Sequence, residues 1–299
     1  MIQHPPFLQT DDLIIIVSPS GVVQEDLVRG GAEILQGAGF TVEFAPHVFS
    51  KHFKFAGTNQ QRLSDLQYAL DHSNAKAIYC ARGGFGITHI LDHIDWTLFK
   101  QNPKWIIGYS DITALHHAAY LTGFTSIHTS VLQGLSELSI ENQQAILGAL
   151  KGHSIKMSAK SNFNKSGEST GELVGGNLSL LVHQIGTGSD IDYSGKILFI
   201  EEVGEPLYHV DRMLLQLARA GKLKGLKGLL VGEFFQMTET KELFGASVEE
   251  IIFQHCSIYD FPIGFNFPVG HGEQNWPLVH GANVQLKVSG NSAQLNYLS

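Results

Sequence analysis

The chain has 299 residues, of which 43% are hydrophobic and 16% are charged, a composition typical of globular proteins. Its formal net charge of -8 and its lack of a basic stripe argue against a nucleic-acid-binding surface. Apolar runs such as Leu13–Val17 are far too short to span a membrane, and the N-terminus shows no basic segment followed by an apolar run, so we expect no secretory signal.

Predicted strands and helices alternate through the first half of the chain. Short apolar runs predict strands at Leu13–Val17, Thr41–Phe44, Ala77–Cys80, Trp105–Gly108 and Thr125–His128. Apolar residues at helical spacing predict helices at about Gln24–Gln36, at Gln60–His72, after Gly86 through Leu91, and after Gly108. This alternation predicts a parallel sheet with helices on both faces.

The composition changes after a predicted helix near Glu141–Leu150. Residues 151–172 are rich in Lys, Ser, Asn and Gly without a long apolar period, which is typical of a linker. Beyond them the patterns predict strands at Lys196–Ile200, Leu226–Val231 and Asn283–Val288, and helices at Tyr208–Ala220 and Val248–His255. We therefore expect an N-terminal domain over residues 1–152, a linker over 153–170 and a C-terminal domain over 171–299.

Ser110 lies on a predicted strand-to-helix turn. The apolar run from Trp105 breaks at Gly108, and helical spacing resumes at Ile112. Hydrolases of the α/β class place a nucleophilic serine on such a turn, where the helix N-terminus favours developing negative charge. The alternative is that Ser110 and Asp111 only cap the helix, since both residue types are favoured there. The G-x-S-x-G motif is also incomplete, because Ile112 occupies the place of its second glycine.

A glycine-rich turn, Arg82–Gly86, follows the third predicted strand. Such a turn can present backbone N–H groups to an anion, either as a binding site or as an oxyanion hole. Neither the G-x-G-x-x-G dinucleotide pattern nor the GxxxxGK[ST] phosphate loop is present. A tight turn that requires positive φ explains the same residues without any ligand.

Two further motifs carry groups that complement a nucleophilic serine. Glu201 and Glu202 end a predicted strand, where only one of two successive side chains can face a given cleft. His271 lies between glycines in a loop, which lets the backbone place its imidazole freely. Ser110, Glu201 and His271 would supply a nucleophile, an orienting acid and a general base. A solvated strand end and a surface histidine are the alternatives for the last two.

The sequence resembles the LD-carboxypeptidase family of serine peptidases over nearly its whole length. Seven segments in the family's order carry the resemblance: SPSG at Ser18–Gly21, FAGTNQQR at Phe55–Arg62, ARGGFG at Ala81–Gly86, GYSDITAL at Gly108–Leu115, GELVGGNLSLL at Gly171–Leu181, FIEEVGEPLYHVDRML at Phe199–Leu214 and PVGHG at Pro268–Gly272. The resemblance implies an α/β fold, in which an N-terminal parallel-sheet domain similar to class I glutamine amidotransferases precedes a smaller C-terminal α/β domain.

The resemblance also implies a site and an activity. Ser110, Glu201 and His271 match the family's catalytic triad, and the N–H groups of Gly84 and Asp111 match its oxyanion hole. Family members are cytoplasmic, commonly homodimeric and free of metals and cofactors. They release the terminal D-Ala from murein tetrapeptide during cell-wall recycling. No cluster of His, Cys or acidic residues has metal-ligand spacing here, and the two cysteines, Cys80 and Cys256, form no C-x-x-C.

A carboxypeptidase must also hold the free carboxylate of its substrate. We expect Arg82 or Arg212 to bind it, with Asn177 as a further substrate-binding residue. Relatives often carry His-Gly-Pro where this chain has His128-Thr129-Ser130, in a loop that we expect to line the substrate cleft.

Three other functions remain open from the sequence. Family members that cleave peptidyl-nucleotide antibiotics of the microcin C type share the triad. A non-catalytic module that binds a peptide or a sugar between two domains would need no triad. A glutamine amidotransferase-like enzyme would need a cysteine nucleophile, but Cys80 does not centre a strand-turn-helix.

Overall fold

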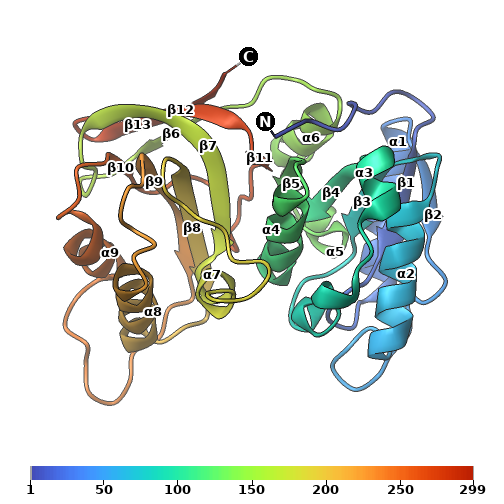
Figure 1. Cartoon of the computed structure of the whole chain (residues 1–299), viewed down its shortest axis with the longest axis horizontal. Helices are drawn as coiled ribbons and strands as arrows, with labels where there is room; N and C mark the ends of the chain where they lie inside the picture. The colour runs from blue at the N-terminus through green and yellow to red at the C-terminus, as the bar shows by residue number, and fades with distance from the viewer. Residues whose placement is uncertain (1, 299) are drawn as a thin grey trace. The chain divides into compact units, whose positions relative to one another are not determined.

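The computed structural model describes residues 2–298, so residues 1 and 299, the outer ends of the two expected domains, lie outside the described part. The chain divides into two compact units (Figure 1). Unit 1 contains the residues up to Ser154 together with the returning segment Trp276–Val279. Unit 2 contains Ile155–Asn275 and the residues from His280 onward.

Unit 1 is built around a sheet of short, buried strands. They are β1 (Leu13–Val17), β2 (Thr41–Phe44), β3 (Ala75–Cys80), β4 (Trp105–Gly108), β5 (Ser126–His128) and β11 (Leu278–His280). The strand order is β11-β5-β4-β3-β1-β2, and β1 to β5 pair in parallel (Figure 1). The central strands are mostly apolar because helices cover both faces of such a sheet; Lys76 in β3 is the exception among β1, β3 and β4.

The helices of unit 1 connect these strands. They are α1 (Glu25–Gly37), α2 (Asn59–Asp71), α3 (Thr97–Gln101), α4 (Thr113–Leu121), α5 (Leu132–Leu135) and α6 (Ile140–Leu150). Helix α1 leads outward from β1 to β2, whereas α2 leads back across β1 to β3. Because crossover connections are right-handed, these two helices cover opposite faces of the sheet. Helix α1 packs against α5, and α2 packs against α3.

The helix expected between Gly86 and Leu91 is not an α-helix. Two short 3-10 helices, η1 (Ile87–His89) and η2 (Leu91–His93), occupy this part of the chain. The backbone N–H of Ile87 donates to the Asp111 carboxylate at 2.9 Å, so a side chain from another loop starts this segment. A third 3-10 turn, η3 (Ser110–Ile112), precedes α4.

Unit 2 is built around a mixed sheet. Its strands are β6 (Lys156–Lys160), β7 (Gly167–Asn177), β8 (Ile197–Val203), β9 (Gly228–Phe235), β10 (Ile263–Gly264), β12 (Asn283–Ser289) and β13 (Ser292–Tyr297). The order is β10-β9-β8-β7-β12-β13-β6. Figure 1 shows β7 as a long, strongly curved strand. Its first half pairs antiparallel with β12 and its second half pairs parallel with β8, so it joins the two halves of the sheet.

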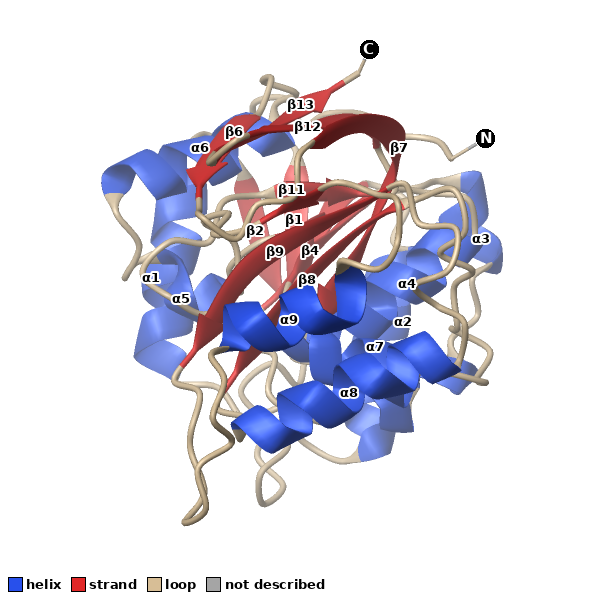
Figure 2. Cartoon of the chain, turned by 90° about the vertical axis from the view of Figure 1, so that its left-hand side faces the viewer, coloured by secondary structure: helices blue, strands red, loops and turns tan. Residues whose placement is uncertain are grey.

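Three helices accompany the parallel part of this sheet: α7 (Leu178–His183), α8 (Leu207–Arg219) and α9 (Val248–Cys256). Figure 2 shows α8 and α9 side by side, and the His255 imidazole meets the Asp211 carboxylate between them at 2.7 Å. Among the helices of residues 2–298, none combines the length and the apolar character needed to cross a bilayer.

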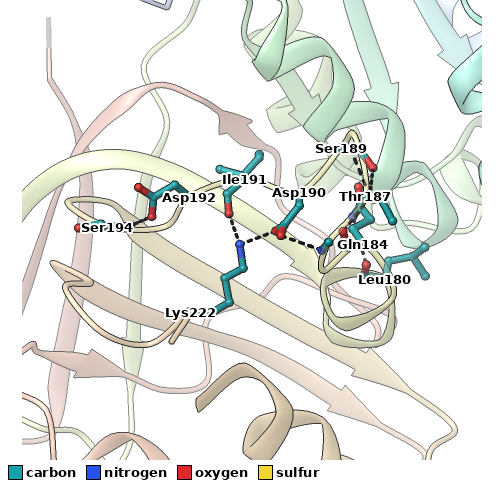
Figure 3. Close-up of polar contacts among 10 residues, drawn as sticks. Leu180, Gln184, Thr187, Ser189, Asp190, Ile191, Asp192, Ser194 and Lys222 are labelled. Atoms are coloured by element: carbon teal, nitrogen blue, oxygen red, sulfur yellow. Dashed lines mark hydrogen bonds and ion pairs between the residues drawn. The ribbon is translucent and has the colours of Figure 1, made fainter. Parts of the chain in front are cut away.

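The loop after α7 is fastened by polar contacts (Figure 3). The Lys222 ammonium contacts the Asp190 carboxylate at 2.5 Å and donates to the Ile191 carbonyl at 2.9 Å. Asp190 also accepts from the Gly186 N–H at 2.9 Å, which closes the loop on itself. These polar contacts add to the burial of Ile191 and Tyr193 in giving the loop a defined conformation.

The segment expected to be a linker, residues 153–170, contains strand β6 and the first part of β7. The Lys and Ser residues of β6 face solvent while Met157 and Ala159 are buried, which is the alternation of an edge strand. The polar composition of this segment therefore concealed the alternation of exposed and buried residues in β6, a strand only a few residues long. Glycines 175 and 176 lie inside β7, which ends at Asn177 directly before α7 begins.

Candidate active site

The loops at the carboxyl ends of β1, β3 and β4 meet at one edge of unit 1. In a doubly wound sheet this is the edge where ligands bind, near the point at which the strand order reverses. The Gly21 N–H, after β1, donates to the Gly83 carbonyl, after β3, at 3.0 Å. Ser110 follows β4 in the same loop cluster, because a Cβ built on Gly83 would lie 3.0 Å from the Ser110 Cβ.

Ser110 occupies a strained backbone conformation. Its φ is 63°, in the left-handed region that residues with a side chain seldom adopt. The Tyr109 residue before it is extended, and α4 begins at Thr113, so the serine stands at a sharp strand-to-helix turn. Nucleophilic serines of α/β hydrolases occupy turns of this kind, and strain of this kind concentrates at functional sites.

This strain predicts an unusual order of stabilities. Because only glycine tolerates positive φ without cost, Ser110→Gly is expected to be more stable than Ser110→Ala by about 1 kcal/mol in urea unfolding. Ser136, exposed and with φ at -71°, is the matched control, where the alanine variant is expected to be at least as stable as the glycine variant. Equal stabilities of the two Ser110 variants would contradict the strained turn.

The glycine turn lies directly beside Ser110. Gly83 leaves no room for a side chain, because its Cβ would also approach the Ser110 Oγ to 3.3 Å. Gly84 has φ at 96°, a conformation that favours glycine. The turn is therefore shaped so that its backbone comes close to the serine, as an oxyanion hole requires. The structure thus brings Gly84 and Asp111 to the same loop cluster as Ser110.

His116, which the sequence analysis did not single out, supports the strand that leads to this turn. Its Nε2 lies 2.8 Å from the Gly108 carbonyl, and its Nδ1 lies 2.8 Å from the Ser126 hydroxyl. Burial lowers the pKa of His116 to about 4, although the hydrogen bond to the Gly108 carbonyl acts in the opposite direction and raises it. The ring is therefore neutral at pH 7, with Nε2 donating to Gly108. No sequence motif marks this role.

In unit 2 the structure brings Glu201 and His271 together. A Glu201 carboxylate oxygen lies 2.7 Å from His271 Nδ1, and the glutamate side chain is 0% exposed. Burial lowers the pKa of His271, but the Glu201 charge and hydrogen bond, together with the charges of Glu202 and Glu233, raise it more, so the net shift is upward. A buried carboxylate that accepts from Nδ1 fixes the neutral tautomer in which Nε2 carries the lone pair, which is the state of a general base.

A β-bulge adds a carboxylate that the sequence analysis missed. Ile200 pairs with Val231 and Glu202 pairs with Phe234, so β9 has one more residue than β8 opposite Glu201. Glu233 lies in this bulge, and its carboxylate packs on Gly272, where an added Cβ would lie 1.8 Å away. A carboxylate near the end of a predicted strand is the same signal that singled out Glu201, and could have found it.

Glu202 has different partners from Glu201. It accepts from the Asn177 amide at 2.7 Å, from the Ser179 N–H at 2.8 Å and from the Val203 N–H at 2.9 Å. Burial raises the pKa of Glu202 to about 7, although these donors favour its charged form. Asn177 is itself buried and caps α7 through the Leu180 N–H. Both residues therefore have structural contacts in unit 2, and substrate binding by Asn177 stays a prediction.

The two candidate arginines differ in their surroundings. Arg82 is the first residue of the glycine turn and donates to the Val22 carbonyl. Its guanidinium therefore connects the loop after β3 to the loop after β1. Arg212 is exposed on α8, with its guanidinium 5.1 Å from the centre of the Tyr208 ring. The structure places them in different units, and the identity of the carboxylate-binding arginine stays a prediction.

Cysteine chemistry is disfavoured at Cys80. Its side chain is buried at the end of β3, and burial raises the pKa of its thiol, so the nucleophilic thiolate is suppressed. Within residues 2–298, no group of three or more His, Cys, Asp or Glu residues could hold a metal ion.

Comparisons with known proteins agree with this architecture. The N-terminal domain of LD-carboxypeptidases matches residues 14–129, and their C-terminal domain matches residues 170–286. The murein tetrapeptide carboxypeptidase of Pseudomonas aeruginosa is 31% identical over 281 residues, which cover 89% of this chain and 91% of the relative.

Solved structures show the same fold. The crystal structure of muramoyltetrapeptide carboxypeptidase from Oxalobacter formigenes is 27% identical, with a TM-score of 0.88 over 96% of this chain and 99% of that one. The microcin C7 self-immunity protein MccF shares the fold at 20% identity, with a TM-score of 0.87 over 98% of each chain. Because the two domain matches together span more than half of its residues, this chain belongs to the LD-carboxypeptidase family.

Proposed function

We propose that the protein is a serine carboxypeptidase that hydrolyses the L,D peptide bond of murein tetrapeptide and releases its terminal D-Ala. The observation that carries this proposal is the Glu201 carboxylate, 0% exposed, at 2.7 Å from His271 Nδ1, in the arrangement of an orienting acid and a general base. The strained turn at Ser110 and the names of the relatives, which act on murein peptides, support it.

In the proposed mechanism the Ser110 hydroxyl attacks the carbonyl carbon of the L,D bond. His271 Nε2 accepts the hydroxyl proton and then gives it to the departing amine of D-Ala. Glu201 holds the imidazole tautomer and stabilises its charged form. The N–H groups of Gly84 and Asp111 would bind the oxyanion of the tetrahedral intermediate. Water then repeats these steps on the acyl-enzyme, and Ser110 is regenerated.

Substrate binding and cellular context complete the proposal. Arg82 or Arg212 would hold the carboxylate of the terminal D-Ala. A place in peptidoglycan recycling, a cytoplasmic location and a homodimeric state stay predictions from the family resemblance, as does independence from metals and cofactors. Retention of activity in EDTA would support the last of these.

We expect the enzyme to cleave a tetrapeptide but not a pentapeptide that ends in D-Ala-D-Ala. Inverting the acyl-side α-carbon directs its side chain at the wall of the site or moves the carbonyl oxygen away from the oxyanion donors. Loss of one such donor lowers the rate by a factor of about 100 to 1,000. The values of kcat/KM, measured by D-Ala release from both peptides, should differ by that factor.

Two results would contradict this specificity. Comparable kcat/KM values for the two peptides would rule out the L,D preference while leaving the triad in place. Turnover of a peptidyl-nucleotide without cleavage of either murein peptide would assign the enzyme to the antibiotic-immunity branch. In that case the His128-Thr129-Ser130 segment, which departs from the family pattern, is the first place to look for the cause.

A further inference from the structure

Arg62 is a buried cation with an unusual set of partners. The residue is 1% exposed, and no carboxylate lies within ion-pair distance of it in the described part of the chain. Its guanidinium instead donates to the Pro19 carbonyl at 2.5 Å, the Gly86 carbonyl at 2.7 Å and the Asn59 amide oxygen at 2.6 Å. It also lies 5.0 Å from the centre of the Phe55 ring.

A charge in this position is costly. Removing a guanidinium from water costs several kcal/mol, and an apolar side chain of similar volume would fill the same space more cheaply. What an apolar residue cannot do is bind two carbonyls from different loops at once. The planar fork of arginine presents several donors in fixed directions, which suits it to this task. Arg62 therefore joins the loop after β1, at Pro19, to the loop after β3, at Gly86.

The peptide group between Gly86 and Ile87 is held from both sides. Its carbonyl accepts from Arg62, and its N–H donates to the Asp111 carboxylate at 2.9 Å. Gly86 has φ at 135°, and an added Cβ would lie 2.8 Å from the Arg62 guanidinium, so this contact excludes any side chain there. Asp111 directly follows Ser110. Arg62 is therefore connected, through the peptide group between Gly86 and Ile87, to the turn that carries Ser110.

We propose that Arg62 is a positioning residue that sets the distance between the two backbone donors of the oxyanion hole. One donor, Gly84 N–H, lies in the glycine turn whose end Arg62 holds. The other, Asp111 N–H, belongs to the residue whose carboxylate holds the same peptide group. This inference rests on the proposed function, because an oxyanion hole has meaning only for an acyl-transfer enzyme. It also explains why the FAGTNQQR segment, far from the triad in sequence, carries a buried arginine.

The test compares Arg62→Lys and Arg62→Met with Lys104→Met. Lys104 is the matched control because it is also a buried cation of unit 1 that donates to two carbonyls, Leu70 at 2.7 Å and Asn102 at 3.0 Å. Neither of these carbonyls belongs to the glycine turn. Per folded molecule, the Arg62 variants should lose about 10- to 100-fold in kcat with KM nearly unchanged, since small misplacements of catalytic groups cost up to about 100-fold. Lys104→Met should lose stability but keep its kcat.

A second variant and a second measurement distinguish the loss of positioning from misfolding of the Arg62 variants. Asn59→Ala removes one acceptor of Arg62 at an exposed position and should lower kcat several-fold without changing KM. Amide hydrogen exchange of Ile87, followed by NMR without substrate, should accelerate in Arg62→Lys and Asn59→Ala but not in Lys104→Met. Unchanged exchange of Ile87, or kcat losses no larger than that of Lys104→Met, would overturn the proposal.

These readouts separate the inference from the proposed function. If the wild-type protein cleaves no murein peptide but Ile87 exchange responds to Arg62, the activity is wrong and the positioning contact stands. If the wild-type protein cleaves tetrapeptide but neither kcat nor exchange responds to Arg62, the activity stands and the positioning role is rejected.

Discussion

Ser110→Ala is expected to lower kcat for D-Ala release from tetrapeptide by about a millionfold, the scale seen when the nucleophile of a serine protease is removed. The adjacent Gly83 has no side chain that could replace the hydroxyl, and Cys80 is buried with a raised thiol pKa. The measurement is single-turnover hydrolysis with enzyme in excess, which also detects slow residual turnover.

The same variant separates an enzyme from a binding module. Substrate affinity, measured by calorimetry on Ser110→Ala, should remain close to the KM of the wild-type protein if the hydroxyl acts mainly in the transition state. Ser136→Ala removes an exposed serine hydroxyl of unit 1 and should leave both kcat and affinity unchanged. Substantial activity in Ser110→Ala would exclude this serine as the nucleophile.

Glu201→Gln is expected to reduce kcat by about 10⁴-fold, as when the triad acid of a serine protease is made neutral. The glutamine amide can donate to His271 Nδ1, which favours the wrong tautomer. Glu202→Gln is the matched control, an adjacent glutamate whose partners are Asn177 and two backbone N–H groups. Its expected effect is a loss of about 1–3 kcal/mol in stability, with kcat changed only a few-fold. Equal catalytic effects would show that the assignment of the two carboxylates is wrong.

The pH profile provides an independent check of the Glu201–His271 pair. The base must be neutral to act, so kcat/KM should rise with pH through the raised pKa of His271. Without the Glu201 charge, burial is opposed less strongly, and the pKa of His271 falls. The residual activity of Glu201→Gln should therefore rise at lower pH than the activity of the wild-type protein. The pH at which the activity of Glu202→Gln rises should differ less from that of the wild-type protein. A shift in the opposite direction would contradict this electrostatic account.

The sequence alone determined the central strands of unit 1. Strands β1 and β4 have the bounds that their apolar runs predict, because parallel strands buried on both faces need apolar side chains along their whole length. The strand-turn-helix around Ser110 was visible for the same reason, since a buried strand is followed at once by a helical period. A strand that is buried along its whole length therefore shows a continuous apolar run, which can be recognised in the sequence.

Only the tertiary structure decided the rest. A Cβ on Gly175 in β7 would lie 2.0 Å from the Phe199 carbonyl, so glycine there serves close strand packing, which its sequence neighbours do not reveal. Glu201 and His271 are 70 residues apart, and nothing in their sequence separation indicates that they meet. Arg62 looked like an ordinary helix residue because its partners are backbone carbonyls of distant loops. Every residue carries a backbone carbonyl, so a sequence does not show which carbonyl a side chain will bind. The contacts that shape this site therefore become visible only when the chain is folded.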